Sequence, residues 1–313
     1  RFYTRPGQAL FVSGNIPELG LELIHRSPEP VALRYMNAEF WQLSLDLMNV
    51  PHFPIRYHYL LRMEDGSMIS EWGNDRLIPV SPKSATEIQV IDVWNYAGEY
   101  ENAFYSTPFQ GILLPAHTKK SHIKTPKHFT HIFKVKAPLL SSNQCVCLSG
   151  SGEGLKEWSI EETILMQKEG NWWTAPVNLP REFLPVHYKY GVYDLKHEQF
   201  LYFENDPDRS LPGDALDQKR IIVHDGFVHL PNNTWKGAGV SIPVFSLRSK
   251  HSFGTGEFTD LKLLVDWAKK TGLKLIQMLP VNDTSATGTW QDSYPYGAIS
   301  AFALHPLYLN LEE

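Results

Sequence analysis

Cysteine is scarce in this sequence, and long apolar runs are missing. Of 313 residues only Cys145 and Cys147 are cysteines, and no apolar run approaches the roughly 18 residues that a membrane span needs. The two thiols share one face of an expected strand, so we interpret them as small buried hydrophobes rather than a disulfide or a metal pair. No signal peptide is visible, and the cytoplasm is the default location, although the chain starts at Arg1 rather than Met.

Clusters of positive charge are also missing. Lys and Arg number 29 against 34 Asp and Glu, a formal net charge of −5. No footprint for nucleic acid or an anionic membrane is present, and a neutral polymer suits the chain better. Glycines at 254 and 256 precede an expected helix, but neither the Lys-Ser/Thr of a phosphate loop nor a G-x-G-x-x-G pattern accompanies them. We therefore expect no cofactor and no metal site.

Aromatic residues are well represented, and the chain is long enough for several cores. Trp, Tyr and Phe make up 12% of the sequence. That content fits a surface that stacks on sugars and fits large β-sandwich cores equally well. A chain of this length can bury two or three cores, because domains run about 100 to 200 residues. We expect a multidomain protein.

The last quarter of the chain has a strand–helix–strand pattern. The pattern predicts a strand over 240–247, a helix over 258–271 that ends at Gly272, and a second strand over 274–281. This is how a (β/α)8 barrel begins. Residues 235–313 supply about two of its eight units, whereas a complete barrel takes about 250 residues. We expect the truncated start of a TIM barrel here.

Two earlier segments repeat one order of motifs. The first has Leu-Phe-Val-Ser-Gly at 10–14, Tyr-His-Tyr at 57–59 and Glu-Trp-Gly-Asn-Asp-Arg at 71–76; the second has Val-Cys-Leu-Ser-Gly at 146–150, Tyr-Lys-Tyr at 188–190 and Glu-Asn-Asp-Pro-Asp-Arg at 204–209. The offsets of 136 (150 − 14) and 133 (209 − 76) indicate duplicated modules of near-equal length. Short alternating strands, for example over 55–63, 87–94 and 185–194, predict an all-β sandwich for each.

These patterns divide the chain into four parts. We expect a first β-sandwich over 1–96 (the first module), a linker over 97–129, a second β-sandwich over 130–231 (the second module) and the barrel start over 235–313. The linker contains three prolines and the basic stretch at 119–124, and we expect it to run over the surface.

The sequence of residues 235–313 resembles one enzyme family. Trp-Lys-Gly-Ala-Gly-Val at 235–240, Gly-Thr-Gly-Glu-Phe-Thr-Asp-Leu at 254–261, Gln-Met-Leu-Pro-Val-Asn-Asp-Thr at 277–284 and Asp-Ser-Tyr-Pro-Tyr-Gly at 292–297 are similar, in that order, to the opening of the 4-α-glucanotransferases. This family, glycoside hydrolase family 77, includes the amylomaltases and the long plant-type cytosolic disproportionating enzymes. The resemblance implies transfer of α-1,4-glucan segments between sugar acceptors.

The two modules resemble starch-binding domains of carbohydrate-binding module family 20, the second more closely than the first. In that family two stacking rings and a hydroxyl-binding amine build the main site. The resemblance places Trp158, Phe203 and Lys189 in those roles. Buried core aromatics are the ordinary alternative for Trp158 and Phe203, because strand facing is unknown.

The first module looks less complete by the same comparison. Trp72 fits one platform and His58 stands at the lysine position, but the segment 17–22 has no counterpart of Trp158. Trp41 and Trp173 lie at corresponding places in the two modules. They are candidates for a second sugar site, and core packing is at least as good an explanation.

In the barrel segment, substrate residues belong on loops that follow the strands. By resemblance Tyr296 and Ser293 contact the sugar next to the cleaved bond. Asp283 and Asp292 are further candidates, with loop-capping as their ordinary role. Retaining transfer requires two carboxyl groups that flank the glycosidic bond. The resemblance places these on later strands, so we assign no catalytic residue and expect the fragment to be inactive.

Together these features predict the N-terminal part of a 4-α-glucanotransferase, with α-1,4-glucans (starch, glycogen, malto-oligosaccharides and maltose) as its partners. One alternative is a non-enzymatic α-glucan-binding protein, and another makes the modules interaction domains. Continuation of the β/α pattern in the coding sequence after residue 313 would favour the enzyme.

Overall fold

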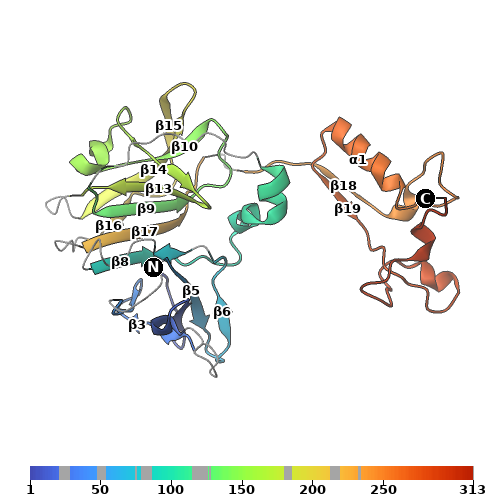
Figure 1. The fold of residues 1–313 in the computed structure, drawn as a ribbon, viewed down its shortest axis with the longest axis horizontal. Helices are drawn as coiled ribbons and strands as arrows, with labels where there is room; N and C mark the ends of the chain where they lie inside the picture. The colour runs from blue at the N-terminus through green and yellow to red at the C-terminus, as the bar shows by residue number, and fades with distance from the viewer. Residues whose placement is uncertain are drawn as a thin grey trace. The chain divides into compact units, whose positions relative to one another are not determined.

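The computed structural model describes residues 1–20, 29–47, 54–74, 76–78, 87–114, 126, 128–179, 185–211, 219–231 and 234–312. The chain divides into two compact units, Arg1–Asn233 and Thr234–Glu313 (Figure 1). The first unit contains both modules, and its described residues are built mainly from β-strands.

The first module is organised around the strand β5. A sheet in the order β2-β1-β5-β6, with β7 also paired to β5, comprises β1 (Ala9–Gly14), β2 (Val31–Ala32), β5 (Ile55–Arg62), β6 (Met68–Ser70) and β7 (Leu77–Ile78). A small hairpin joins β3 (Arg34–Tyr35) to β4 (Trp41–Gln42). Ile55 and Tyr57 on β5 are buried, whereas Arg56 between them is exposed. This alternation confirms the expected strand, and one face of it packs on Val12, Ile16 and Leu19.

The second module is a sandwich of two sheets. One has the order β11-β10-β14-β15, with β16 paired to β14, and comprises β10 (Gln144–Gly150), β11 (Ile164–Leu165), β14 (Val186–Asp194), β15 (Gln199–Phe203) and β16 (Arg209–Leu211). The other contains β9 (His131–Lys136), β12 (Gln167–Glu169), β13 (Trp172–Val177) and β17 (Lys219–Phe227). Both cysteines lie buried and unbonded in β10, as expected, and burial raises each thiol pKa to about 12.

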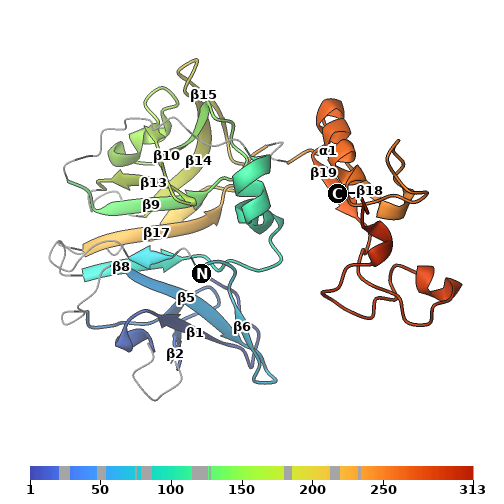
Figure 2. The ribbon, with the colours of Figure 1, turned by 45° about the vertical axis from the view of Figure 1, so that its right-hand side comes forward.

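The two modules share a sheet. The last strand of the first module, β8 (Glu87–Asp92), runs parallel to β17 and completes the order β12-β13-β9-β17-β8. Figure 2 shows β8, β17 and β9 side by side. The strand itself matches the expectation for 87–94, but the expected boundary at 96/130 separates segments that the sheet joins. The modules are therefore one structural unit.

The segment after β8 is partly buried, which corrects the expectation of a surface linker. It forms the 3-10 helix η3 (Tyr100–Tyr105) and the π-helical turn η4 (Phe109–Leu113), and Glu101, Asn102 and Phe104 are buried. The Asn102 amide hydrogen-bonds Asn95 and the backbone carbonyl of Tyr96. The basic stretch at 119–124 lies outside the described residues.

The second unit contains a parallel β-α-β arrangement. The strands β18 (Gly239–Ile242) and β19 (Leu275–Met278) pair in parallel, and the helix α1 (Asp260–Thr271) connects them. Gly272 ends the helix in the left-handed region at φ 77°, as expected. The first strand is shorter than expected because Pro243 has no N–H to donate, and the 3-10 turn η7 (Val244–Ser246) follows. Two parallel strands do not by themselves define a barrel.

Two further 3-10 turns, η8 (Trp290–Ser293) and η9 (Pro306–Tyr308), complete the second unit.

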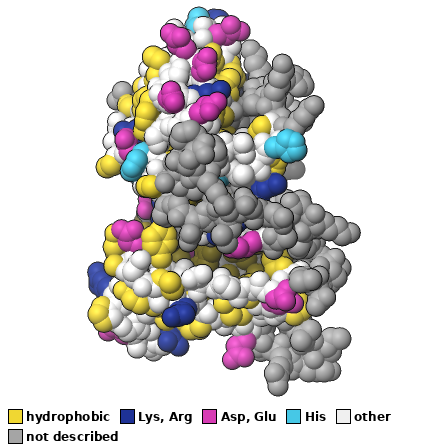
Figure 3. All heavy atoms as spheres, turned by 90° about the vertical axis from the view of Figure 1, so that its left-hand side faces the viewer, with side chains coloured by type: hydrophobic (Ala, Val, Ile, Leu, Met, Phe, Trp, Pro, Cys, Tyr) yellow, Lys and Arg dark blue, Asp and Glu magenta, His cyan; other side chains and the backbone are white. Residues whose placement is uncertain are grey.

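Among the helices of the described residues, none has the length and apolar character of a membrane span, and no group of three or more His, Cys, Asp or Glu could hold a metal ion. The face drawn in Figure 3 carries Lys and Arg scattered among acidic and hydrophobic side chains. Its described part has no continuous basic surface.

Candidate functional site

Trp158 and Phe203 lie side by side on the second module. Trp158 ends the 3-10 segment η5 (Glu153–Trp158), and Phe203 ends β15. Their ring centroids are 6.3 Å apart at an interplanar angle of 80°, an edge-to-face contact. Both side chains are half-buried. Because edge-to-face rings meet at right angles, they form a corner rather than one flat surface.

The backbone under Trp158 is in an unusual conformation. Lys156, Glu157 and Trp158 have φ values of 67°, 46° and 63°, so three consecutive non-glycine residues adopt the left-handed region. Each costs roughly 1–2 kcal/mol relative to the right-handed region. Such strain persists only where the surrounding structure enforces it, and it clusters at functional sites. Hydrogen bonds from Glu157 N–H to the Gly152 carbonyl and from Ser159 N–H to the Lys156 carbonyl hold the turn.

The described part of the first module contains the start of the same turn, with glycine at its first left-handed position. Gly14 and Gly150 each lie where an added Cβ would meet a leucine, Leu19 in the first module and Leu155 in the second. The next residue is Gly20 (φ 77°) in one and Lys156 (φ 67°) in the other. Glycine pays little in this region. Sequence reasoning missed the strained run, although a lysine at the position of a turn glycine is a signal that could have found it.

Lys189 faces the same side of the sheet as Phe203. Gly191 of β14 is paired with Phe203, and Lys189 is two residues from Gly191, so the three share a face. The Lys189 ammonium is 3.6 Å from an Asp208 carboxylate oxygen, and the two side chains are 21% and 53% exposed. A partly exposed amine therefore lies on the same face of the sheet as Phe203. Trp158 and Phe203 are in contact, and Lys189 shares the face of Phe203.

A buried polar framework occurs in both modules. In each, an arginine donates two hydrogen bonds of 2.7–2.9 Å to a glutamate, and that glutamate accepts from a backbone N–H of the central strand at 3.0 Å. In each, two tyrosine hydroxyls donate to one aspartate oxygen at 2.8 Å. The corresponding residues are Tyr57, Tyr59, Glu71, Arg76 and Asp92 in the first module and Tyr188, Tyr190, Glu204, Arg209 and Asp225 in the second. This framework gives a residue-by-residue alignment of the modules.

Asp92 also contacts the second module. Its Oδ1 is 2.6 Å from Nδ1 of His224 on β17, and Arg76 lies 3.2 Å away. Burial alone would raise the pKa of Asp92, but the charges of Arg76 and His224 outweigh burial and hold that pKa well below its usual value. The carboxylate is therefore ionised inside the contact between β8 and β17.

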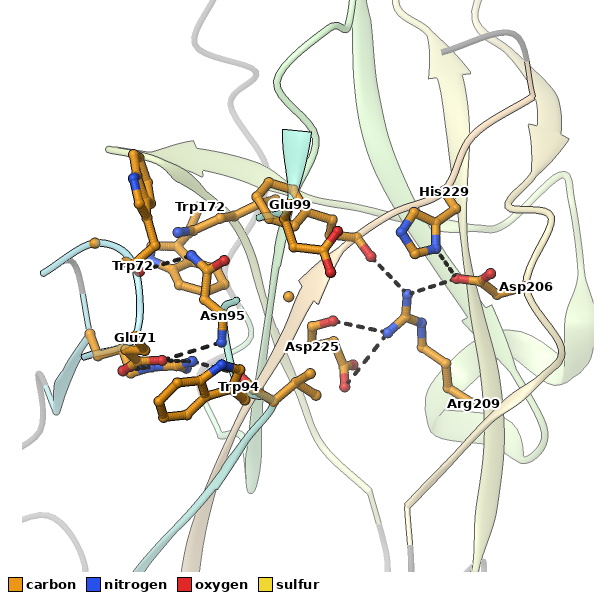
Figure 4. A pocket seen from close by; sticks show the side chains of 16 residues that line it. Glu71, Trp72, Trp94, Asn95, Glu99, Trp172, Asp206, Arg209, Asp225 and His229 are labelled. Atoms are coloured by element: carbon orange, nitrogen blue, oxygen red, sulfur yellow. Dashed lines mark hydrogen bonds and ion pairs between the residues drawn. The ribbon is translucent and has the colours of Figure 1, made fainter. Parts of the chain in front are cut away.

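The framework changes the alignment of Trp72, which does not stand at the position of Phe203. Leu60 pairs with Ser70 on β6 as Gly191 pairs with Phe203 on β15. Ser70 is thus the counterpart of Phe203, and Trp72 lies two residues further along. Trp72 instead lines a cavity of about 200 Å³ between the two modules (Figure 4). The sequence placed Trp72 in the wrong register because a tryptophan beside a glutamate fits the motif in either order.

The remaining first-module positions agree with the expected alignment. His58 pairs with Ser13 as Lys189 pairs with Ser149, so it stands at the lysine position. The residue at the Trp158 position is Glu22, which lies outside the described residues. The first module therefore has neither ring of the pair seen in the second module.

Trp173 and Trp41 differ in their surroundings. Trp173 is 3% exposed, belongs to the main core and donates from Nε1 to the Ala137 carbonyl. A buried ring has no face for a sugar, so core packing describes Trp173 and the candidate sugar role is corrected. Trp41 is half-buried and meets the exposed Tyr35 edge-to-face at 5.3 Å. Only Trp41 retains an accessible ring at this pair of positions.

The candidate residues of the second unit lie on one loop region. Asp292 accepts hydrogen bonds from Thr287 N–H, Thr287 Oγ1 and Gly288 N–H, which lower its carboxyl pKa. Asp283 accepts from Ser285 N–H, which lowers its pKa likewise. Both carboxylates therefore cap their loops.

Ser293 and Tyr296 follow Asp292 on the same loop. Ser293 Oγ donates to the Trp290 carbonyl at 2.6 Å. Tyr296 is 59% exposed and lies against Tyr294, with ring centroids 5.6 Å apart. The structure thus leaves the Tyr296 ring accessible, whereas the Ser293 hydroxyl already has a partner within its own turn.

Two modules with one duplicated framework, of which the second presents an aromatic corner, define a class of duplicated β-sandwich proteins. The family model for the starch binding domain matches residues 1–90 and 129–220. The chain belongs to this starch-binding domain family, in two copies. The family model for 4-alpha-glucanotransferase matches residues 242–313.

Related proteins are similar over different lengths. The 4-alpha-glucanotransferase DPE2 of Oryza sativa subsp. japonica is 32% identical over 99% of this chain and 34% of its own length. A 4-alpha-glucanotransferase of Chlamydia caviae is 47% identical over 23% of this chain and 13% of its own length. The chain thus spans about a third or less of these relatives. The family 20 module of a maltotetraose-forming amylase from Pseudomonas saccharophila covers 30% of this chain and 97% of its own at 12% identity, with a TM-score of 0.25.

Proposed function

We propose that the second module binds α-1,4-glucans such as starch, glycogen and malto-oligosaccharides through Trp158, Phe203 and Lys189. A glucose ring has apolar C–H faces and a rim of hydroxyl groups. The faces pack on aromatic rings, and the hydroxyls need donors and acceptors at the ring edges. The corner formed by Trp158 and Phe203 supplies the rings, and the Lys189–Asp208 pair supplies a donor and an acceptor beside them.

The left-handed run at Lys156 to Trp158 is the observation that carries this proposal. A core tryptophan needs no strained backbone, because ordinary strand geometry buries it, as for Trp173 on β13. The strain at Trp158 instead places a half-buried ring at the end of a turn, where it meets Phe203. Strain of this kind is retained where function requires the position. Loss of the ring should therefore affect binding more than stability.

We propose further that the whole protein is a 4-α-glucanotransferase whose modules hold the glucan for transfer. The similarity to the rice protein over nearly the whole chain supports this activity. In this proposal the second unit begins a (β/α)8 barrel, and the accessible Tyr296 ring contacts a sugar. Asp283 and Asp292 position the loop that carries Tyr296, because their carboxylates already bond to it. The two carboxyl groups that retaining transfer requires are not assigned to either.

Binding to β-cyclodextrin and to soluble amylose tests the first proposal. We expect Trp158→Ala to weaken both, Phe203→Ala to weaken them less because its ring is smaller, and Trp267→Ala to leave them unchanged. Trp267 is a suitable matched control because it lies half-exposed on α1, in the other unit. Isothermal titration with the 313-residue chain measures all three. Equal affinity for wild type and Trp158→Ala would refute the assigned site.

A further inference from the structure

The cavity between the modules has a lining unlike an ordinary packing defect. Trp72 and Trp94 of the first module and Trp172 of the second contribute aromatic rings, and Trp72 and Trp94 are only half-buried. Figure 4 shows Glu71, Trp72, Trp94 and Asn95 together on one side and Asp206, Arg209 and His229 on the other. Exposed Glu99 and His229 are also among the lining residues. Cavities that stay dry are apolar, whereas the mixed lining of this one can hold a polar occupant.

Three buried polar atoms of cavity-lining residues have no hydrogen-bond partner among the described residues, and one of them, Nη1 of Arg76, is ion-paired with Asp92 at 3.2 Å. The Nε1–H of Trp94 is buried without an acceptor, and Oδ1 of Asp225 is buried without a donor. Arg209 Nη1 lies 3.9 Å from that oxygen, beyond hydrogen-bond distance. Asp225 is only 3% exposed. Burial without a partner is unfavourable for both atoms, and both lie just behind the accessible lining of the cavity.

The charges around the cavity favour a neutral ligand. Its arginines are already engaged: Arg76 donates two hydrogen bonds to Glu71, and Arg209 donates two to Glu204. Lys136 is enclosed by the rings of Tyr105, Trp172 and Phe227 at 4.6–5.8 Å. The carboxylates of Glu99, Asp206 and Asp225 complete the lining. An anion would meet these carboxylates while the cations are occupied, so a phosphate or carboxylate ligand does not fit.

We propose that this cavity is a second saccharide site, which takes one glucopyranose ring and is shared by the two modules. The volume of about 200 Å³ lies below the roughly 300–1,000 Å³ of pockets for drug-sized ligands, so it admits a single small ring. In this site the half-buried rings of Trp94 and Trp72 pack on the sugar faces, and the partly exposed carboxylate of Asp206 accepts from a hydroxyl. The glucose identity of the ring rests on the proposed glucan-binding function.

Linear and cyclic probes separate this site from the one at Trp158. β-Cyclodextrin has no chain end and its ring of sugars is too large for the cavity, so it reports on the Trp158–Phe203 corner alone. Glucose and maltose can place a terminal ring in the cavity. Titrations of the 313-residue chain with each probe, followed by tryptophan fluorescence and calorimetry, measure the two sites independently.

Trp94→Phe and Asp206→Asn are the informative variants. Trp94→Phe retains an aromatic ring against Phe2, which lies 5.0 Å away, and reduces the stacking surface, so folding should be preserved. We expect it to weaken maltose binding by about threefold to tenfold, and Asp206→Asn to weaken it by about tenfold, with β-cyclodextrin binding unchanged in both. Trp267→Phe is the matched control.

The outcomes distinguish the two sites and the two sources of the ring. Glucose that binds as tightly as maltose identifies free glucose as the ligand, and tighter maltose binding identifies a chain end. The cavity site is overturned if maltose affinity is unchanged in Trp94→Phe and Asp206→Asn, or if it is lost only in Trp158→Ala. Either result leaves the Trp158 site intact. If neither glucose nor maltose binds saturably, the cavity site is also overturned. If the wild-type chain does not bind β-cyclodextrin, the proposed function is refuted instead.

Discussion

Truncation of two tryptophans in one module separates packing from binding. Trp173→Ala removes a ring that is 3% exposed within the main core, so we expect a loss of about 3–5 kcal/mol. For a unit of this size each kcal/mol lowers the melting temperature by about 2–4 °C, so the expected fall is about 6–20 °C. Trp158→Ala removes one edge-to-face contact worth about 0.5–1.5 kcal/mol, which gives a fall of only a few degrees.

The effect on binding should have the opposite order. A sugar that covers about 80 Å² of the Trp158 ring gains about 2 kcal/mol at 25 cal/mol per Å², and that is about 30-fold in affinity. Trp173→Ala, measured below its melting temperature, should retain normal affinity. Thermal unfolding of the two variants tests the expected order of stability, and β-cyclodextrin titration tests the expected order of affinity. A large loss of stability in Trp158→Ala with unchanged affinity per folded molecule would refute the reasoning.

Three further predictions concern the backbone, pH and cooperativity. Lys156→Gly should stabilise the chain by about 1 kcal/mol, since Gly20 holds the same left-handed position in the first module; a lower melting temperature would contradict this. Burial lowers the pKa of His131 from 6.5 to about 4, so the unfolded chain takes up this proton first. Stability should therefore fall as pH drops from about 6.5 to about 4, by up to about 3 kcal/mol, and His131→Leu should flatten the profile in urea titrations. Because β8 joins β17 and Asp92 contacts His224, calorimetry should show one unfolding transition for both modules, and Asp92→Asn should lower its midpoint; two separate transitions would disprove the coupling.

Local pattern predicted the strands but not their partners across the chain. The expected strands over 55–63 and 185–194 match β5 and β14 to within one residue, because alternation and flanking turn residues act locally. The pairing of Glu87–Asp92 with Lys219–His224 joins segments more than 120 residues apart, and no local signal specifies it. The sequence therefore did not predict that the two modules share a sheet.

Facing and register limited the prediction of the site. The distinction between Trp158 and Trp173 depends on which side of a sheet each ring lies, and a shift of one residue reverses that side. The family resemblance paired Trp158 with Phe203, which are in contact in the structure, but left Trp173 open between a second sugar site and core packing. The alignment of Trp72 was missed for the same reason, because its register follows from the buried Glu71–Arg76 pair rather than from the order of residues in the motif.

The shared sheet has a practical consequence for anyone who cuts this chain. A shortened chain that begins near residue 130 would retain every strand of the second sandwich and still lose the neighbour of β17. Its N–H and C=O groups on that side would then face water as an open edge, ready to pair with a second copy. The same cut would leave His224 without Asp92. Self-association of the excised module would thus be a consequence of the missing strand β8. A glucan affinity measured on that module would be the affinity of the aggregate rather than of the native domain.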